Sequence, residues 1–246
     1  MSAFVTGGSR GIGRAIVLKL AQQGRDVAFS YVNNADAARE TERLAADLAP
    51  GRRVQGYALD VCDSAGVERV VDQVIEDYEN VDTVVNNAAI LRNNAAALMS
   101  DEDWNQVIAT NLTGPFFVTR QFLMHFLSNR SGRIINISSI AQDGASGQVN
   151  YAASKAGLVG MTKTLAREYG PKGITANVVV LGLVPTDMSR EHGDEKLEAF
   201  WKQWCPRKRQ GTPEEVASLV HFLSSDAADF INGEVIHISG GLTYVP

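Results

Sequence analysis

The chain has 246 residues, of which 45% are hydrophobic and 21% charged, and its formal net charge is −5. This length and composition are typical of one globular domain and exclude disordered or collagen-like protein. The charge provides no global attraction for nucleic acid, and no apolar run reaches the ~18 residues that a membrane span needs. Cys62 and Cys205 are the only cysteines, too few for a disulfide scaffold. The N-terminus lacks the basic head and apolar core of an export signal, so we expect a cytoplasmic protein.

Seven short apolar runs without strict alternation are typical of strands that are buried on both faces. They span residues 3–6, 26–31, 54–59, 81–85, 134–137, 175–180 and 235–238. Amphipathic segments of helical length lie between them, at 12–23, 36–48, 64–78, 101–129, 151–169 and 213–224. This order predicts a single α/β domain of Rossmann type, with a doubly wound parallel sheet of seven strands and helices on both faces.

Several local signals refine this prediction. Asp63 and Thr212 are candidate N-caps of the helices that follow them, and Pro213 suits a first helical position. The segment 101–129 is long enough for two helices, with a joint at 111–114. Residues 190–209 break the rhythm with a polar, tryptophan-containing stretch, which we interpret as an insertion on the substrate side. A mobile lid and a fixed helical flap both fit that stretch.

A glycine-rich turn joins the first predicted strand to the first predicted helix, with the sequence Thr6-Gly7-Gly8-Ser9-Arg10-Gly11-Ile12-Gly13. Gly7 permits a tight turn, Gly11 lets backbone amides approach a pyrophosphate, and Gly13 lets the helix pack closely. A helix N-terminus presents unpaired N–H groups and a positive dipole end. The turn therefore predicts a dinucleotide site that includes Ser9, Arg10 and Ile12.

The end of the second strand indicates which nicotinamide cofactor binds. Rossmann enzymes that prefer NAD usually place an acidic residue there. Here the strand ends in Tyr31-Val32-Asn33-Asn34, without a carboxylate to repel a 2′-phosphate. Arg10 lies in the neighbouring turn, and a guanidinium fork suits a phosphate. We therefore expect NADP(H), bound in part by Arg10 and Asn33.

The spacing Thr-Gly-x3-Gly-x-Gly resembles that of the short-chain dehydrogenase/reductase family, and the resemblance extends over nearly the whole chain. It implies a further set of cofactor-binding residues: Asp60, Val61, Asn87, Ala88, Val184 and Thr186. Two positions depart from the family pattern, because Ala89 stands in place of Gly and Leu181 in place of Pro. We expect these departures to alter local geometry and rigidity without abolishing binding.

Tyr151 and Lys155 lie four residues apart in a predicted helix and therefore share a face. A nearby ammonium lowers the pKa of a tyrosine, which suits acid–base work. Taken alone, the pair is more typical of a packed Tyr and a surface Lys. Two serines, Ser138 and Ser139, end an apolar strand at the edge where α/β sheets bind ligands. By resemblance to the family the catalytic serine is Ser139, twelve residues before Tyr151.

The resemblance also implies a role for each of four catalytic residues. Ser139 polarises the substrate carbonyl, and Tyr151 donates a proton to it. Lys155 lowers the pKa of Tyr151 and binds the nicotinamide ribose, so Tyr151 and Lys155 both belong to the cofactor site as well. Asn111 fixes a water that relays protons to Lys155. No metal site is expected.

Within the family, the stretches TGGSRGIGRAI, GRIINISS and NYAASKAGLVGMTKTLARE are most similar to 3-oxoacyl-(acyl-carrier-protein) reductases. This likeness implies NADPH-dependent reduction of a 3-oxoacyl thioester, carried by acyl carrier protein or coenzyme A, in fatty acid or polyketide-type synthesis. Arg130 and Lys172 match the basic positions with which such reductases meet the acidic carrier protein near the cleft. Two exposed basic residues without a role fit equally well.

The family is usually homotetrameric, paired through its long helices and C-terminal strand. Here the run 235–245 is apolar, which would be a liability on a monomer surface. Two other functions remain open. One is a reductase or alcohol dehydrogenase of the same family that acts on a free ketone, sugar or steroid. The other is a non-catalytic NADP(H)-binding regulator, against which the complete set Asn111, Ser139, Tyr151 and Lys155 argues.

Overall fold

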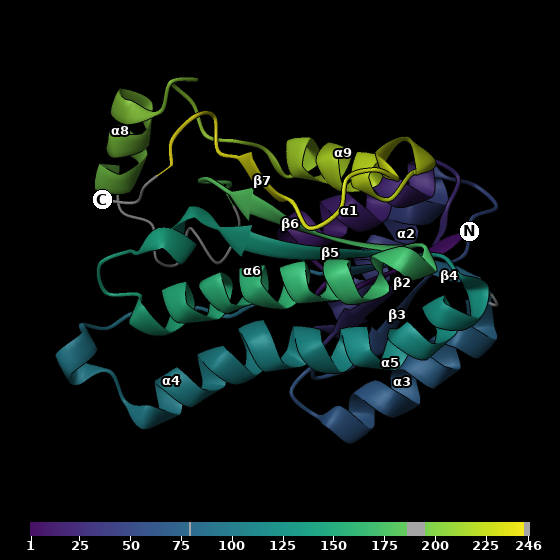
Figure 1. Cartoon of the computed structure of the whole chain (residues 1–246). Helices are drawn as coiled ribbons and strands as arrows, with labels where there is room; N and C mark the ends of the chain where they lie inside the picture. The colour runs from purple at the N-terminus through teal and green to yellow at the C-terminus, as the bar shows by residue number, and fades with distance from the viewer. Residues whose placement is uncertain (79, 186–194, 244–246) are drawn as a thin grey trace.

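Seven parallel strands form one sheet at the centre of the molecule (Figure 1). The computed structural model describes residues 1–78, 80–185 and 195–243, with the backbone alone at 195–198. The strands are β1 (Ser2–Val5), β2 (Asp26–Tyr31), β3 (Val54–Ala58), β4 (Val81–Asn86), β5 (Gly132–Ser139), β6 (Ile174–Leu181) and β7 (Val235–Ile238). Their spatial order is β3-β2-β1-β4-β5-β6-β7. The winding reverses between β1 and β4, which confirms the doubly wound Rossmann-type sheet and places a ligand crevice at the carboxyl ends of these strands.

Helices pack on both faces of the sheet (Figure 1). One face carries α1 (Gly11–Gln22), α2 (Ala35–Leu48) and α9 (Pro213–Leu223), and the other carries α3 (Ser64–Tyr78), α5 (Gly114–Asn129) and α6 (Val149–Tyr169). Short helical turns lie at η1 (Ala96–Leu98), η3 (Ile140–Asp143), η4 (Gly170–Lys172) and η5 (Asp226–Ala228). No helix in the described ranges combines the length and apolar content that crossing a bilayer requires.

Two apolar cores hold these layers together. Leu20 of α1 and Val220 of α9 are buried in one core, and Phe122 and Phe126 of α5 in the other. Burying a side chain of this size contributes roughly 1.5–3 kcal/mol. The predicted caps are confirmed, since Asp63 Oδ1 accepts from the Ala65 N–H at 3.1 Å and Thr212 forms a capping box with Glu215.

Strand β5 differs most from its predicted extent of 134–137. It begins at Gly132 and ends at Ser139, because register with β6 continues at both ends, where Gly132 pairs with Ile174 and Ser139 with Leu181. Both serines therefore belong to the strand itself. Ser139 is fixed by the sheet at the carboxyl edge rather than by a loop.

The predicted joint in 101–129 is a π-helical turn rather than a break. Helix α4 (Asp101–Ile108) continues through η2 (Ala109–Thr113) into α5 without leaving helical geometry. Such π turns occur mostly as single turns within longer helices, frequently at functional sites. Asn111 lies in this turn and is fully buried.

The described part of the predicted insertion 190–209 consists of helix α8 (Glu195–Trp204) and the five residues after it. Residues 190–194 lie outside the described residues. Trp201 is 3% exposed and packs in a third apolar cluster with Ile140, Val180 and Leu242. A buried tryptophan of this kind anchors α8 beside the carboxyl edge of the sheet.

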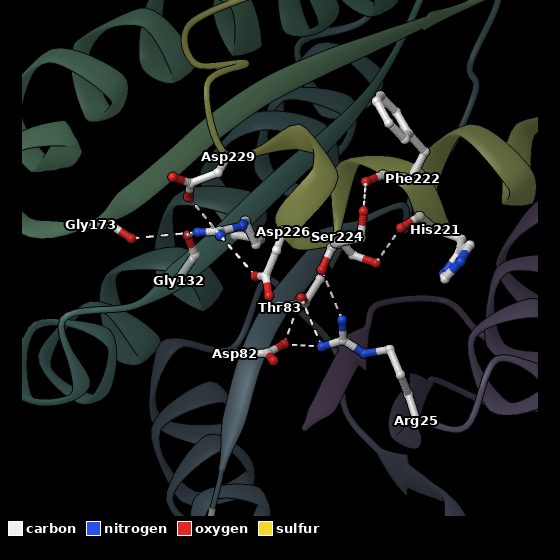
Figure 2. Close-up of polar contacts among 12 residues, drawn as sticks. Arg25, Asp82, Thr83, Gly132, Gly173, His221, Phe222, Ser224, Asp226 and Asp229 are labelled. Atoms are coloured by element: carbon white, nitrogen blue, oxygen red, sulfur yellow. Dashed lines mark hydrogen bonds and ion pairs between the residues drawn. The ribbon is translucent and has the colours of Figure 1, made fainter.

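The opposite, amino edge of the sheet is held by a polar network (Figure 2). Arg25 is 8% exposed, forms an ion pair with Asp82, and donates to Thr83 Oγ1 at 3.0 Å and to the Ser224 carbonyl at 2.9 Å. Burial lowers the pKa of Arg25 to about 10. These contacts connect β4 with the end of α9, far along the sequence.

Candidate active site

A cavity of about 780 Å³ opens at the carboxyl edge of the sheet. Every predicted cofactor-binding residue that the structure describes lines it: Gly7, Ser9, Arg10, Gly11, Ile12, Gly13, Asn33, Asp60, Val61, Asn87, Ala88, Tyr151, Lys155 and Val184. Thr186 lies outside the described residues. The cavity therefore gathers residues that the sequence scatters over six segments.

The glycine turn has the backbone geometry that the sequence predicts. Gly7 and Gly11 adopt φ values of +67° and +55°, which favour glycine. A Cβ on Gly13 would lie 2.1 Å from the Gly7 carbonyl oxygen, so the close approach is to the turn itself rather than to the sheet. Helix α1 begins here, and its N-cap, Arg10, makes no side-chain hydrogen bond to the first-turn amides. Those amides are available to an anion.

Thr6 and Asn87 brace this turn from behind. Thr6 Oγ1 accepts from the backbone N–H groups of Asn87 at 2.9 Å and Ala88 at 3.0 Å. Asn87 Nδ2 donates to the Thr6 carbonyl at 2.9 Å. Sequence reasoning missed Thr6 as a site residue, although it stands first in the glycine motif. Its position at the end of a buried strand was the available signal.

The end of β2 lies beside the glycine turn, where the sequence predicts a phosphate site. Tyr31, Val32, Asn33 and Asn34 line the same cavity as Arg10. Asn34 is committed to capping α2, since its Oδ1 accepts from the Ala37 N–H at 2.8 Å. Asn33 is exposed, and the guanidinium of Arg10 has no hydrogen-bond partner among the described residues. This donor set fits an additional phosphate.

Tyr151 and Ser139 converge on the cavity from α6 and β5. Burial raises the pKa of the Tyr151 hydroxyl to about 12, and its hydrogen bond with Ser139 opposes that shift. Ser138 is turned elsewhere, because its Oγ contacts Gln142 Oε1 at 2.8 Å and the Lys155 carbonyl at 3.3 Å. Both serines line the cavity, and Ser139 is the one whose hydrogen bond affects the pKa of Tyr151.

Lys155 is 3% exposed and lies next to Tyr151, with its Nζ 5.5 Å from the centre of the tyrosine ring. Burial lowers the pKa of Lys155 to about 8. Burial penalises the charged form of both residues, and at Tyr151 it outweighs the opposing hydrogen bond from Ser139. The expected lowering of the Tyr151 pKa by Lys155 stays a prediction.

Asn111 lies behind the cavity wall and not in it. Its Oδ1 accepts from the Ile90 N–H at 2.9 Å, and its Nδ2 donates to the Ile90 carbonyl at 3.0 Å and to Ser154 Oγ at 3.3 Å. The π turn orients the side-chain amide of Asn111 towards the backbone of Ile90. Asn111 therefore holds the chain that follows β4, and it contacts Ser154, the residue before Lys155.

The cavity is also lined by residues outside the predicted set of catalytic and cofactor-binding residues. They are Ile90, Leu91, Arg92, Asn93, Ile140, Gln148, Leu183 and Trp201. No short motif marks them, since they come from the loop after β4, from η3, from the start of α6 and from α8. Two of them lie in segments that the sequence connects with the substrate: Gln148 between the catalytic strand and Tyr151, and Trp201 in the predicted insertion.

Arg130 and Lys172 do not lie near the cleft of their own chain. Arg130 caps the end of α5, shortly before β5 begins. Lys172 lies in η4, shortly before β6 begins. Both residues therefore belong to the amino edge of the sheet, whereas the cavity lies at the carboxyl edge. Helix α6, with 21 residues, spans roughly 30 Å between these edges. The expected position beside the cleft is corrected, because residues that precede parallel strands gather at the far edge.

The donor set of the cavity fits a nicotinamide dinucleotide. A methyl group on Gly13 would fill the cradle that its missing Cβ leaves, the α1 amides are uncapped, and Arg10 has a free guanidinium within the described residues. The same ranges contain no cluster of three His, Cys, Asp or Glu residues that could hold a metal ion.

Comparison with known proteins agrees with this architecture. The family model described as Enoyl-(Acyl carrier protein) reductase matches residues 7–243. The 3-oxoacyl-[acyl-carrier-protein] reductase FabG of Escherichia coli (strain K12) is 41% identical over 244 residues, covering 99% of this chain and 97% of the relative. FabG of Staphylococcus epidermidis is 40% identical and covers 98% of each chain. Levodione reductase has a similar crystal structure, with a TM-score of 0.93 and 32% identity over 98% of this chain and 96% of that one. The chain belongs to the short-chain dehydrogenase/reductase family.

Proposed function

We propose that this protein is an NADPH-dependent ketoreductase that converts a 3-oxoacyl thioester into the 3-hydroxyacyl thioester. The observation that carries the proposal is the convergence of Ser139, Tyr151 and Lys155 on one cavity, next to the uncapped N-terminus of α1. The names of the relatives at about 40% identity support a 3-oxoacyl substrate bound to acyl carrier protein.

In this proposal the first-turn amides of α1 and Arg10 bind the phosphates, with Arg10 and Asn33 at the 2′-phosphate that distinguishes NADPH. Asp60, Val61, Asn87 and Ala88 border the adenosine half, and Val184 and Thr186 the nicotinamide. When bound, NADPH supplies the hydride. Lys155 has three N–H donors, of which one is used on the Ile137 carbonyl, so the others remain for the ribose.

The protein groups supply the proton and orient the carbonyl. Ser139 Oγ donates a hydrogen bond to the substrate carbonyl oxygen, and the Tyr151 hydroxyl transfers its proton to that oxygen as negative charge develops. Burial raises the pKa of Tyr151 to about 12, so the hydroxyl carries its proton at neutral pH. The ammonium of Lys155 stabilises the phenolate that remains.

Asn111 keeps the proposed role of holding a water that returns a proton towards Lys155. Its carbonyl oxygen accepts one bond from the Ile90 N–H and retains a second lone pair.

The test is NADPH oxidation with four substrates: acetoacetyl-acyl carrier protein, acetoacetyl-coenzyme A, a free β-keto ester and crotonyl-coenzyme A. We expect turnover of the acetoacetyl thioesters, and loss of it in Tyr151→Phe while NADPH still binds by fluorescence titration. Turnover retained in Tyr151→Phe would remove Tyr151 from the mechanism. Preference for crotonyl-coenzyme A would assign the enoyl reduction named by the family model.

A second candidate is reduction of a free ketone or oxidation of a free alcohol. The structural neighbours favour it, since levodione reductase and a putative gluconate dehydrogenase, with a TM-score of 0.94, carry names of this kind. The free β-keto ester distinguishes the two. A protein that binds NADPH without turning over any of these substrates would be the non-catalytic regulator.

We further propose a cytoplasmic homotetramer. Trp104, Phe116 and Met124 on the helices α4 and α5 are 38%, 45% and 70% exposed, and β7 is an edge strand. Exposed apolar groups and a free sheet edge both favour a second copy. Arg130 and Lys172 would then reach a cavity only in a neighbouring subunit. Light scattering after gel filtration tests the tetramer, and a monomeric mass would refute it.

A further inference from the structure

One stretch of the cavity wall is the loop at residues 87–93, which we call the wall loop. Two buried asparagines hold it. Asn111 pairs with both backbone groups of Ile90, and Asn150 Nδ2 donates to the Arg92 carbonyl at 3.1 Å. Both asparagines are 0% exposed. Their amides are the anchors of a segment that has little secondary structure of its own.

Asn150 also contacts the residue that we propose as the proton donor. Its Oδ1 accepts from the backbone N–H of Tyr151 at 2.7 Å. An N–H in the first turn of a helix has no partner within the helix, and the N-cap Gln148 makes no side-chain bond to it. Asn150 thus satisfies the amide that would otherwise be left unpaired beside the cavity.

A third contact extends this junction to α4. Asn150 Nδ2 approaches the Asp103 carbonyl at 3.3 Å and Met99 Sδ at 3.3 Å. Next to it, the Asn94 N–H donates to the Gly147 carbonyl at 2.9 Å, and residues Asn94 and Gln148 form a parallel bridge. One buried amide therefore joins the wall loop, α4 and the first turn of α6.

We propose that Asn150 is a positioning residue, which couples the wall loop to Tyr151 and so sets the distance between the catalytic hydroxyl and the substrate. Asn150 does not line the cavity, and it acts through Tyr151 and Arg92. This inference rests on the proposed ketoreductase function and adds a determinant of it. Misplacement of a reacting group by about 1 Å can lower a rate by about 100-fold, so a lost anchor has a measurable effect.

The test compares Asn150→Ala with Asn177→Ala. Asn177 is a matched control because it is 1% exposed and makes the same kinds of bond, donating to the Ile231 carbonyl at 2.7 Å and accepting from the Glu234 N–H at 3.0 Å, away from the cavity. We expect both variants to lose stability, because each loses the hydrogen bonds of a buried amide. We expect kcat for acetoacetyl-coenzyme A to fall about 10- to 100-fold in Asn150→Ala alone, with KM raised and the Kd for NADPH within about twofold of wild type.

Three outcomes are decisive. A fall of kcat in Asn150→Ala that Asn177→Ala does not show supports positioning. Equal kcat values in the two variants reduce Asn150 to a structural residue and overturn the inference. If Asn150→Ala does not fold, Asn150→Ser retains a small uncharged polar side chain that is too short to bond both the Tyr151 N–H and the Arg92 carbonyl, and unchanged kcat and KM in that variant overturn the inference as well. Lack of turnover by the wild type would instead refute the proposed function.

Discussion

The side-chain nitrogen of Lys155 donates a hydrogen bond of 2.9 Å to the carbonyl oxygen of Ile137. This bond joins β5 to the first turns of α6. Ile137 lies two residues before Ser139 in the strand, and Lys155 lies one helical turn after Tyr151. The backbone of the sheet thus fixes the positions of the proposed catalytic residues relative to one another. The same burial that permits this bond makes the ammonium of Lys155 costly.

The stability of the protein should therefore depend on pH through Lys155. Its pKa is about 8 in the fold and 10.5 ordinarily, so between these values the unfolded chain binds more protons. The free energy of unfolding contributed by Lys155 then rises with pH from about 8 to 10.5. Relative to Lys155→Met, the wild type should be less stable at pH 7, by at most about 3 kcal/mol, and the gap should close towards pH 10.5. Urea unfolding of both proteins across this range measures it; a constant gap contradicts the prediction.

Cofactor preference should depend on Arg10. Loss of one charge-assisted phosphate contact costs roughly 1.5–3 kcal/mol, so Arg10→Ala should raise the Kd for NADPH by about 10- to 150-fold. The Kd for NADH should change little, because NADH lacks the 2′-phosphate. Arg39→Ala is the control, since Arg39 is exposed and pairs with Asp36 on α2. Tighter binding of NADH than of NADPH by the wild type would refute the expected preference.

A methyl group should be harmful at Gly13 and harmless at Gly160. At Gly13 it would lie 2.1 Å from the Gly7 carbonyl oxygen and 2.7 Å from Asn87 Nδ2. Overpacking of this kind costs about 1–3 kcal/mol, so Gly13→Ala should weaken NADPH binding and lower Tm. Gly160 lies within α6 with open space around it, and Gly160→Ala should raise stability by about 0.4–1 kcal/mol. Unaltered NADPH binding in Gly13→Ala would show that the turn can relax.

The ion pair at the amino edge should support stability without affecting catalysis. Arg25→Met leaves the carboxylate of Asp82, which is 13% exposed, without its partner, and this costs at most about 3–5 kcal/mol. Arg52→Ala, at an exposed pair with Asp26 of 3.8 Å, should cost no more than about 1 kcal/mol. Chemical unfolding measures both effects, and kcat should be unchanged. A large fall in kcat for a folded Arg25→Met would show that the two edges of the sheet are coupled.

Charge reversal of Arg130 and Lys172 should affect only the carrier-bound substrate. We expect Arg130→Glu with Lys172→Glu to raise KM for acetoacetyl-acyl carrier protein by about tenfold or more, since like charges then face an acidic partner. KM for acetoacetyl-coenzyme A should stay the same. Equal effects on both substrates would reject a docking role, as would an effect that persists when the protein is monomeric.

Much of the fold was predictable because its signals are local. Seven apolar runs marked the strands, Thr212 marked the start of α9, and the spacing of Tyr151 and Lys155 placed both on one helical face. The amino-edge position of Arg130 and Lys172 was also predictable, because both residues directly precede strands of a parallel sheet.

The remaining features arise from contacts between distant segments. Asn150 reaches Arg92 and Asp103, which are 58 and 47 residues away, and no pattern within one segment encodes such a junction. The pKa of Lys155 depends on burial by the whole fold. The π turn at Ala109–Thr113 escaped prediction because hydrophobic periodicity does not resolve one additional residue in a helix.

Because of the additional residue in the π turn, the orientation of α4 relative to α5 depends on the number of residues in the helix as well as on their types. Each residue advances an α-helix by about 100°, so a deletion within 109–113 would rotate α4 against α5 by that angle. The chain would retain an uninterrupted helix, yet either the hydrogen bonds between Asn111 and Ile90 or the packing of α5 against the sheet would be lost. A substitution here can be compensated by a neighbouring side chain, whereas a deletion cannot. Insertions and deletions between Asp101 and Asn129 therefore disturb the site more than substitutions there do.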